Sequence, residues 1–330
     1  DKADNIQKIV VPASRFSLSR SSSFASSVHD EIKRINSMDV VYGLTQIYSC
    51  DLLRLGGGLI VFWEQLKYKN KRLKRFLSFA NYLNKKLEKR ILFSKTLKSV
   101  VVNSEMCRKQ LIKYYDFDEK NIKLIRNGVD SDYFSVSSIN DVKETDFFTK
   151  IKDFSKKHLT ILFISNNYQR KGLNEILHFM SQSNKEIRLI VSGRGNIDHY
   201  KTFCSEKKIE DRVFFTGFCE DIRMLFYYSD IFVLPTYYDP FANVCLEAAS
   251  FGLPVVTTLT NGFSELIKNG KNGFILEHPE DQINLKKAFE VFSKRKSHED
   301  INIDCRNSVI HLTPSKNAEE TIELFEKFKM

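Results

Sequence analysis

Cysteine is scarce and unpatterned in this sequence, which excludes the folds that depend on it. The six cysteines form no C-x-x-C pair and no Cys/His pair at zinc-ligand spacing, so neither a disulfide framework nor a structural zinc site is indicated. Long apolar runs are also missing. None approaches the roughly 18 residues of a membrane span, and the first residues do not resemble a signal peptide. We therefore expect a cytoplasmic protein.

Glycine and proline are sparse as well. With 13 glycines and 6 prolines in 330 residues, the chain is neither collagen-like nor largely disordered. Its 42% hydrophobic and 28% charged residues are an ordinary globular composition. At about 100–200 residues per domain, the length predicts two domains.

Acidic residues fall short of the basic ones only in the first half. Residues 1–150 hold 27 basic and 17 acidic side chains, whereas residues 151–330 hold 24 of each, so the net charge of +10 arises in the first half. The stretch 67–98 alone has twelve Lys or Arg and one acid. This favours an anionic partner, of which a phosphorylated ligand, a membrane surface and nucleic acid are the candidates; the alternative is solvated lysines around a core helix. No nucleic acid is expected, because no recognised binding module accompanies the charge.

The second half alternates short apolar runs with amphipathic stretches, the pattern of a doubly wound parallel sheet. Ligands of such a sheet bind at the carboxyl ends of its strands. The predicted strands are 159–165, 187–192, 212–216, 230–235, 254–258 and 273–277, and the predicted helices are 173–183, 198–208, 220–228, 241–251 and 281–295.

The first half shows a weaker and incomplete version of the same pattern. The polar stretch 136–158 is the expected linker, and 17–27 is an expected loop that leads into a helix. We predict one α/β domain over 1–145, together with the final helix 316–330, and a second α/β domain over 146–315. The first domain's predicted elements are strands at 8–11, 39–43, 98–103 and 122–126 and a helical stretch at about 64–94.

The most informative segment is LPTYYDPFANVCLEAASFGLPVVTT, in which a strand, a loop and a helix follow one another. Asp239 is a candidate N-cap of the helix. The backbone N–H groups of Ala242, Asn243 and Val244 would then form an anion site that suits a phosphate. Glu247 would turn toward the same place and accept hydrogen bonds from two vicinal hydroxyls. The alternative is a capped helix with an exposed glutamate.

Two further strand ends carry candidate ligands. Arg170 and Lys171 open a helix after a polar loop, where two adjacent cations can neutralise a diphosphate. The alternative is a basic helix start that arises by chance. Gly217 ends another strand, and its backbone can approach a flat base.

Several motifs together resemble the retaining family 4 glycosyltransferases, whose architecture of two Rossmann domains is called GT-B. Within that family, CDLLRLGGG followed by a tryptophan resembles the branch that includes lipopolysaccharide core glucosyltransferases. The motifs that carry the resemblance are NGVDSDYF (127–134), RKGL (170–173), RVFFTGF (212–218), DPFANVCLEAASFGLPVVTT (239–258) and NGFSELIKNGKNGFI (261–275).

The resemblance assigns roles to the residues that match the family's motifs. Arg170 and Lys171 match the pair that binds the donor diphosphate. Glu247 matches the second glutamate of the E-x7-E motif, which holds the nucleotide ribose. Asp239 stands at the position of the first glutamate, which contacts the donor sugar, so the shorter carboxylate puts the sugar's identity in question. We take Asp239, Arg170 and Lys171 as the catalytic residues.

The remaining donor contacts and the acceptor side follow from the same resemblance. Phe241, Ala242, Asn243 and Val244 match the stretch whose backbone meets sugar and phosphate, and Gly217 with Phe218 matches the nucleobase wall. The resemblance makes 1–145 with 316–330 the acceptor-binding Rossmann-like domain and 146–315 the nucleotide-sugar-binding Rossmann-like domain. On the acceptor side we expect Gly56, Gly57 and Gly58.

The chain departs from the family in its first domain. The family's first strand and its Gly-rich acceptor loop have no counterpart upstream of KIVVPA, so part of the acceptor domain is expected to be missing. His29 is a candidate for the histidine on the face of that domain, and the alternative is a surface helix residue. Asp130-Ser131-Asp132 spells a metal-binding D-x-D signature, but within NGVD we interpret it as a turn and predict no metal.

The expected function is a retaining, metal-independent hexosyl transfer. The expected donor is a UDP-linked sugar, and the expected acceptor is an anionic cell-envelope glycan or glycolipid. We expect the enzyme to need no cofactor. Residues 67–98 would attach the enzyme peripherally to the inner face of the membrane. The alternatives are a nucleotide-sugar epimerase of the same fold and a non-catalytic sugar-nucleotide-binding fragment.

Overall fold

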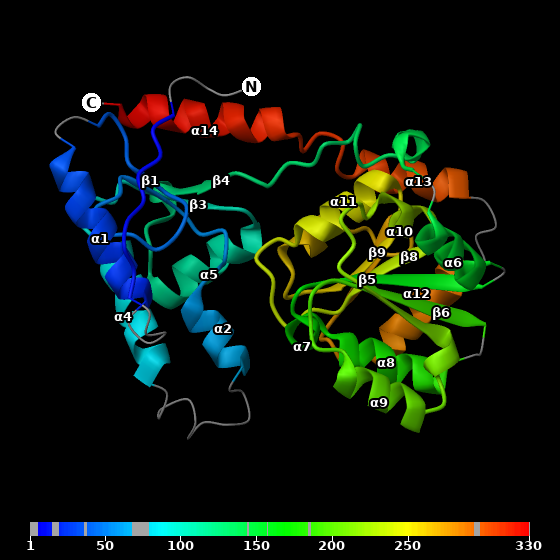
Figure 1. The fold of residues 1–330 in the computed structure, drawn as a ribbon. Coiled ribbons are helices and arrows are strands. Elements are labelled where there is room, and N and C mark those ends of the chain that lie inside the picture. The colour runs from blue at the N-terminus through cyan, green and yellow to red at the C-terminus, as the bar shows by residue number, and fades with distance from the viewer. Residues whose placement is uncertain are drawn as a thin grey trace. The chain divides into compact units, whose positions relative to one another are not determined.

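The computed structural model describes residues 6–14, 20–35, 38–67, 79–143, 145–156, 158–183, 186–293 and 298–329. The chain divides into two compact units, which we call unit 1 (1–125 with 320–330) and unit 2 (126–319). Each unit is built on one parallel sheet, of four strands in unit 1 and six in unit 2. The predicted α/β class with two sheets, the first the smaller, is therefore confirmed (Figure 1).

The sheet of unit 2 has the order β10-β9-β8-β5-β6-β7, and all its pairs are parallel. The chain runs outward from β5 to β7 and then returns to place β8 beside β5. Loops that leave β5 and β8 in opposite directions open a crevice at this reversal. All six predicted strands are confirmed: β5 (Leu159–Ile164), β6 (Ile187–Ser192), β7 (Val213–Gly217), β8 (Ile231–Leu234), β9 (Val255–Thr258) and β10 (Gly273–Leu276).

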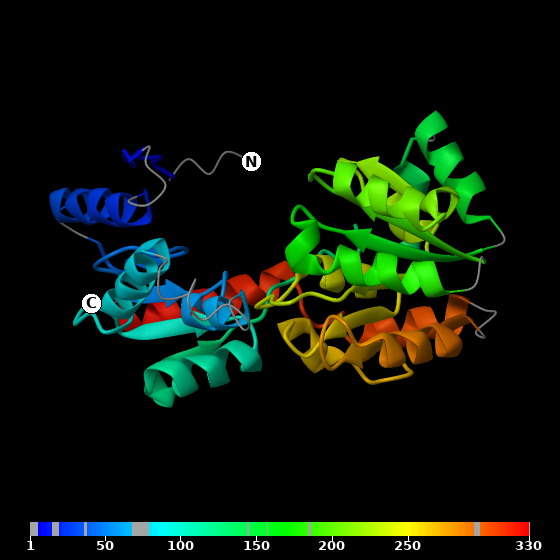
Figure 2. The same ribbon diagram turned by 90° about the horizontal axis from the view of Figure 1, so that it is seen from below.

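Helices cover both faces of this sheet. Figure 1 shows α8 and α9 on one face and α10 and α11 on the other, and Figure 2 shows the same layers from below. The helix α12 lies against α8, where the rings of Phe179 and Phe289 stack with centroids 4.7 Å apart. The helices of unit 2 are α6 (Asp146–Ser155), α7 (Tyr168–Lys171), α8 (Leu173–Gln182), α9 (Asp198–Glu206), α10 (Arg223–Tyr227), α11 (Asn243–Phe251), α12 (Gln282–Ser293) and α13 (His298–Asn307), with 3-10 turns η2 (Val136–Asp141), η3 (Glu210–Arg212) and η4 (Gly262–Leu266).

Two segments of unit 2 differ from the sequence prediction. The expected linker 136–158 contains η2 and α6, and Phe148 and Ile151 of α6 are buried in the core of unit 2. The interpretation as a linker is wrong there, because two apolar residues three apart suffice to pack one face of a polar helix. The helix α13 was not predicted, since its sequence has few apolar residues.

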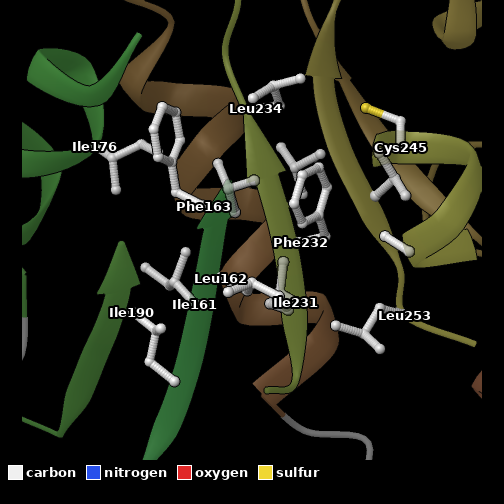
Figure 3. Close-up of a cluster of buried hydrophobic side chains, with 14 of the residues drawn as sticks. Ile161, Leu162, Phe163, Ile176, Ile190, Ile231, Phe232, Leu234, Cys245 and Leu253 are labelled. Carbon is white, nitrogen blue, oxygen red and sulfur yellow. The ribbon is translucent and has the colours of Figure 1, made fainter. Parts of the chain in front are cut away.

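The core of unit 2 lies on both faces of the strands. Figure 3 shows Phe163 of β5 and Phe232 of β8 among the aliphatic side chains of neighbouring strands and helices. Both phenyl rings are fully buried. Because the sheet is covered on both sides, its strands are almost continuously apolar, which is why the sequence reveals them so clearly.

The sheet of unit 1 has the order β1-β2-β3-β4 and is also parallel. The predicted strand 8–11 is wrong: residues 6–14 have no regular structure, and Ile9 and Val10 are exposed. The strand β2 was not predicted, because three residues are too few to show a pattern. The four strands are β1 (Tyr42–Gly43), β2 (Leu52–Arg54), β3 (Ser99–Val102) and β4 (Ile122–Leu124).

Alternate residues of β3 pack on opposite faces of the sheet of unit 1. Val100 and Val102 meet α4 and α5, whereas Val101 meets Leu324 near the end of α14. The helix α1 begins inside the serine-rich tract that we expected to be a loop, and α2 and α4 cover the two ends of the predicted helical stretch, of which residues 68–78 lie outside the described part. The helices are α1 (Arg20–Arg34), α2 (Ile60–Lys67), α4 (Phe79–Leu92), α5 (Glu105–Tyr115) and α14 (Pro314–Phe328), with a 3-10 turn η1 (Glu119–Asn121).

Candidate functional site

Asp239 lies in the loop between β8 and α11, at the carboxyl end of the sheet of unit 2. The loop after β9 holds its backbone: the N–H of Asp239 donates to the carbonyl of Thr260 (3.0 Å), and the N–H of Gly262 donates to the carbonyl of Asp239 (3.0 Å). One carboxylate oxygen accepts a hydrogen bond from the backbone N–H of Phe241 (3.1 Å). The side chain is therefore fixed in one orientation at the crevice.

The prediction that Asp239 caps α11 is wrong. The helix begins at Asn243, and its N-cap is Ala242, whose methyl side chain cannot accept a capping hydrogen bond. The side chain of Asn261 does part of that work instead, since its Oδ1 accepts from the N–H of Ala242 (3.2 Å). Asp239 is thereby left available for another contact.

The side chain that contacts Asp239 is Lys171 of α7, a helix of a single turn. Asn167 caps the turn by accepting from the N–H of Arg170 (3.1 Å), and Gly172 ends it with φ of +85°. A Cβ at Gly172 would stand 2.1 Å from the carbonyl oxygen of Pro235, so only glycine lets α7 pack this closely on the end of β8. The guanidinium of Arg170 then donates to the carbonyl of Tyr238 (2.8 Å).

Lys171 and Asp239 form a buried ion pair within unit 2. The two residues are 8% and 9% exposed. Burial lowers the pKa of the Lys171 ammonium, and the positive charge of Arg170 acts in the same direction. The structure thus brings the three predicted catalytic residues together where the neighbouring strands β5 and β8 end.

The start of α11 adds backbone donors to the same unit. Of the three N–H groups predicted to be available, that of Ala242 is occupied by Asn261. Those of Asn243 and Val244 have no acceptor among the described residues, as expected for the first turn of a helix. Phe241 is buried and its ring packs edge-on against Phe263, so only its backbone can take part in binding.

Glu247 faces a pocket of about 280 Å³ that lies wholly in unit 2. Burial raises the pKa of its carboxyl to about 7. Phe218 lines the same pocket and is 57% exposed, which is unusual for a phenyl ring. Beside it, Gly217 has φ of +70° and open space around its Cα, and its carbonyl accepts from the N–H of Gly193 (2.9 Å).

Several other residues of this pocket were not predicted as site residues. Asn166, Ser192 and Glu220 each lie at or just after the carboxyl end of a strand, so the rule that ligands bind there would have found them. Tyr133 also lines the pocket but follows no strand, and only the tertiary structure brings it there. Asp130, as predicted, forms a turn: its Oδ1 accepts from the N–H groups of Asp132 (3.1 Å) and Tyr133 (3.0 Å).

The predicted acceptor-side glycines lie in unit 1, in the loop between β2 and α2. A methyl group on the Cα of Gly56 or Gly57 would meet no other described part of the chain within 4 Å, and Gly58 has φ of +74°. The buried Glu88 of α4 caps the helix that follows by accepting from the N–H of Ile60 (2.8 Å). The loop therefore exposes backbone that no side chain of the described residues covers, and Glu88 caps the helix α2 that follows it.

His29 and the basic stretch 67–98 also belong to unit 1. His29 is half-buried on α1, and its Nδ1 lies 2.8 Å from the hydroxyl of Ser49. Within the basic stretch, Lys85 pairs with the buried Glu64 (2.8 Å), so this cation supports the packing of α2 on α4. Lys86 and Lys89 are exposed, and residues 68–78 of the stretch lie outside the described part. No helix among the described residues is both long and apolar enough to cross a membrane.

The two parallel sheets place this protein in the GT-B fold class. The crystal structure of WaaG, a glycosyltransferase involved in lipopolysaccharide biosynthesis, superposes with a TM-score of 0.79 at 17% identity, covering 96% of this chain and 86% of that one. A structure of Anabaena HepE in complex with UDP superposes with a TM-score of 0.69 at 17% identity, covering 92% and 83%.

The family follows from the sequence itself. Residues 6–133 match the family described as Glycosyltransferase Family 4, and residues 144–305 match the one described as Glycosyl transferases group 1. The two matches together cover most of the chain, which therefore belongs to the group 1, family 4 glycosyltransferases. The resemblance inferred from the motifs is confirmed.

Curated relatives match over about half of the chain. An uncharacterized glycosyltransferase of Methanocaldococcus jannaschii is 26% identical over 179 residues, which are 53% of this chain and 45% of that protein. The lipopolysaccharide glucosyltransferase WaaG of Escherichia coli K12 is 22% identical over 184 residues, 53% of this chain and 49% of that protein. The matches thus span less than half the length of these relatives.

Proposed function

We propose that this chain is a retaining, metal-independent glycosyltransferase that moves a hexose from a UDP-linked donor to a hydroxyl of a cell-envelope glycan or glycolipid. The observation that carries the proposal is the convergence of Arg170, Lys171 and Asp239 at the carboxyl ends of the neighbouring strands β5 and β8 of unit 2. Two cations and a carboxylate held this firmly suit a ligand with a diphosphate on one side and sugar hydroxyls on the other.

The pocket beside them accounts for the nucleoside. Glu247 would accept hydrogen bonds from the two ribose hydroxyls, and Gly217 with Phe218 would form the wall for the base. The UDP complex of HepE, which shares the fold, supports UDP as the nucleotide.

Catalysis in this scheme is mainly electrostatic. When the bond between sugar and diphosphate breaks, negative charge grows on the departing diphosphate. Arg170, Lys171 and the N–H groups of Asn243 and Val244 would stabilise that charge, and because they are positioned beforehand they need little reorganisation. Asp239 would orient the sugar hydroxyls so that the acceptor hydroxyl reaches the anomeric carbon from the face that the diphosphate leaves, as retention of configuration requires.

Unit 1 would hold the acceptor. Its bare loop at Gly56–Gly58 can approach a glycan closely, and exposed cations such as Lys86 and Lys89 on α4 suit an anionic lipid or glycan. The involvement of WaaG in lipopolysaccharide biosynthesis supports an envelope acceptor.

The first test is thermal unfolding of the purified chain with UDP, GDP, ADP and UDP-hexoses, in the absence of metal. A ligand that binds only the folded form raises the apparent stability, and UDP compounds should raise Tm by about 2–4 °C for each kcal/mol of stabilisation. If none of these nucleotides raises Tm, the result contradicts the proposal. The chain is then incubated with the donor that binds. Formation of a new glycoside when an envelope extract is added indicates transfer, whereas isomerisation of the donor without any acceptor indicates an epimerase.

The affinity for a nucleoside is expected to depend on the protonation of Glu247. Because its pKa is raised to about 7 and the carboxylate is the better acceptor for hydroxyls, binding weakens as pH falls. Uridine is the suitable probe, since it has the ribose hydroxyls but no phosphate to respond to Lys171. Its Kd should rise about ten-fold from pH 8 to pH 6, as expected when only the carboxylate form binds. The variant Glu247→Gln should show a flat profile; an equally steep one would assign the titration to another group.

A further inference from the structure

Two aromatic rings line the pocket of unit 2 that Glu247 faces, and each has a guanidinium against it. The ring of Phe218 has the Arg194 guanidinium 4.0 Å from its centroid, and the ring of Tyr133 has that of Arg223 at 4.2 Å. Both rings are strongly exposed, Phe218 at 57% and Tyr133 at 42%. Each ring faces the pocket and is supported by a charged group. Exposed aromatic surfaces of this kind suit a flat ligand.

Tyr133 is held in place from two directions. Its backbone N–H is bound by Asp130 within the turn of the NGVD motif (3.0 Å). Its ring lies on Arg223, which is itself immobilised: Asp221 accepts from Nε (2.9 Å) and Nη2 (2.6 Å) of Arg223 in a forked pair, and the carbonyl of Ser138 accepts from Nη1 (2.8 Å).

The arrangement is costly unless it is used. Arg223 is only 8% exposed, and burying a guanidinium requires that its donors be satisfied, as the three contacts just described do. The ring that this buried cation supports is nevertheless left in the pocket, where it is far more exposed than a ring that serves packing alone. The cluster therefore holds an exposed aromatic surface in a fixed position in the pocket.

We propose that Tyr133 stacks on the nucleobase of the donor, opposite the wall at Phe218, and that Arg223 with Asp221 is the positioning pair that holds its ring. This inference rests on the proposed function, because it assumes that the pocket takes a nucleoside. The added contact to the base comes from Tyr133, a residue that does not follow a strand of the sheet. Stacking needs no match of donors and acceptors, so Tyr133 supplies affinity, whereas polar groups of the pocket such as Asn166 and Glu220 distinguish one base from another.

The test compares ligands with and without a base in the full chain. Calorimetric Kd values are measured for UDP, GDP and ADP and for inorganic pyrophosphate, which has the diphosphate alone. Tyr133→Ala should raise the Kd of the tightest nucleotide about ten-fold or more and leave that of pyrophosphate unchanged. Tyr133→Phe should stay within about two-fold of wild type, because the ring is kept. Tyr227→Ala, which removes another exposed tyrosine of unit 2, is the matched control and should have no effect.

A double-mutant cycle tests the positioning role. Arg223→Gln should weaken nucleotide binding in the wild-type background and add little once Tyr133 is alanine, because its effect passes through that ring. Equal effects in both backgrounds would assign Arg223 a merely structural role. An unchanged nucleotide Kd in Tyr133→Ala, with tight wild-type binding, overturns the stacking contact alone. Failure of the wild-type chain to bind any nucleotide better than pyrophosphate overturns the proposed function as well.

Discussion

Replacing Arg170 and Lys171 together by alanine is expected to reduce kcat/KM for sugar transfer at least about 1,000-fold. Removal of a single donor to a developing anion costs on the order of 100- to 1,000-fold in rate. In the proposed mechanism the two cations act on the same diphosphate, so their losses are not expected to be simply additive. Steady-state kinetics with the donor found by thermal unfolding would measure the effect.

The matching control is the double variant Lys286→Ala with Lys287→Ala. It removes two adjacent exposed cations from α12 of the same unit and changes the net charge equally. This variant should keep wild-type kinetics, and both double variants should keep the wild-type circular dichroism spectrum. A fully active Arg170/Lys171 double variant would end the assignment of the diphosphate to this strand end.

Asp239→Asn is expected to lower both turnover and stability. The amide cannot neutralise Lys171, and breaking a buried ion pair by removing one partner costs about 3–5 kcal/mol of unfolding free energy. We expect the lower part of that range, because burial already lowers the pKa of Lys171 and lets it lose its proton. Turnover should fall about 100-fold, since the sugar loses the group that orients it. Urea unfolding and kcat are the two measurements.

A second substitution separates these two effects. In Asp239→Asn with Lys171→Met, no charge of this pair remains buried, so much of the lost stability should return while turnover stays low. Recovery of both would show that Asp239 acts only through the stability of unit 2. Asp211→Asn is the control, because that carboxylate is exposed and its ion pair with Arg188 is worth at most about 1 kcal/mol.

The strand ends of unit 2 could be predicted from the sequence because their causes are local. A strand covered on both faces must be apolar along its whole length, and the polar residue that follows it marks the ligand edge of the sheet. Arg170, Lys171 and Gly217 were found in this way. In unit 1 the same logic missed β2, which is only three residues long and leaves no pattern.

The start of α11 shows why local rules were insufficient at the site. Asp, Pro and a following apolar run form an ordinary helix-start signal, and it placed the cap three residues too early. Asn261, which reaches the helix from the loop after β9, occupies the N–H of Ala242. Lys171 arrives from α7 and engages Asp239. Neither partner is near in sequence, so no local pattern could reveal either contact.

Apolar periodicity and motif spacing are properties of neighbouring residues, and they sufficed for the α/β class, the six strands of unit 2, the family and the residue types at the candidate site. Three features needed the folded chain: which N–H groups of α11 remain available, the pairing of Lys171 with Asp239, and the meeting of Tyr133 with Phe218 around one pocket. These features depend on side chains that separate strands bring together, and burial then sets their charge and orientation.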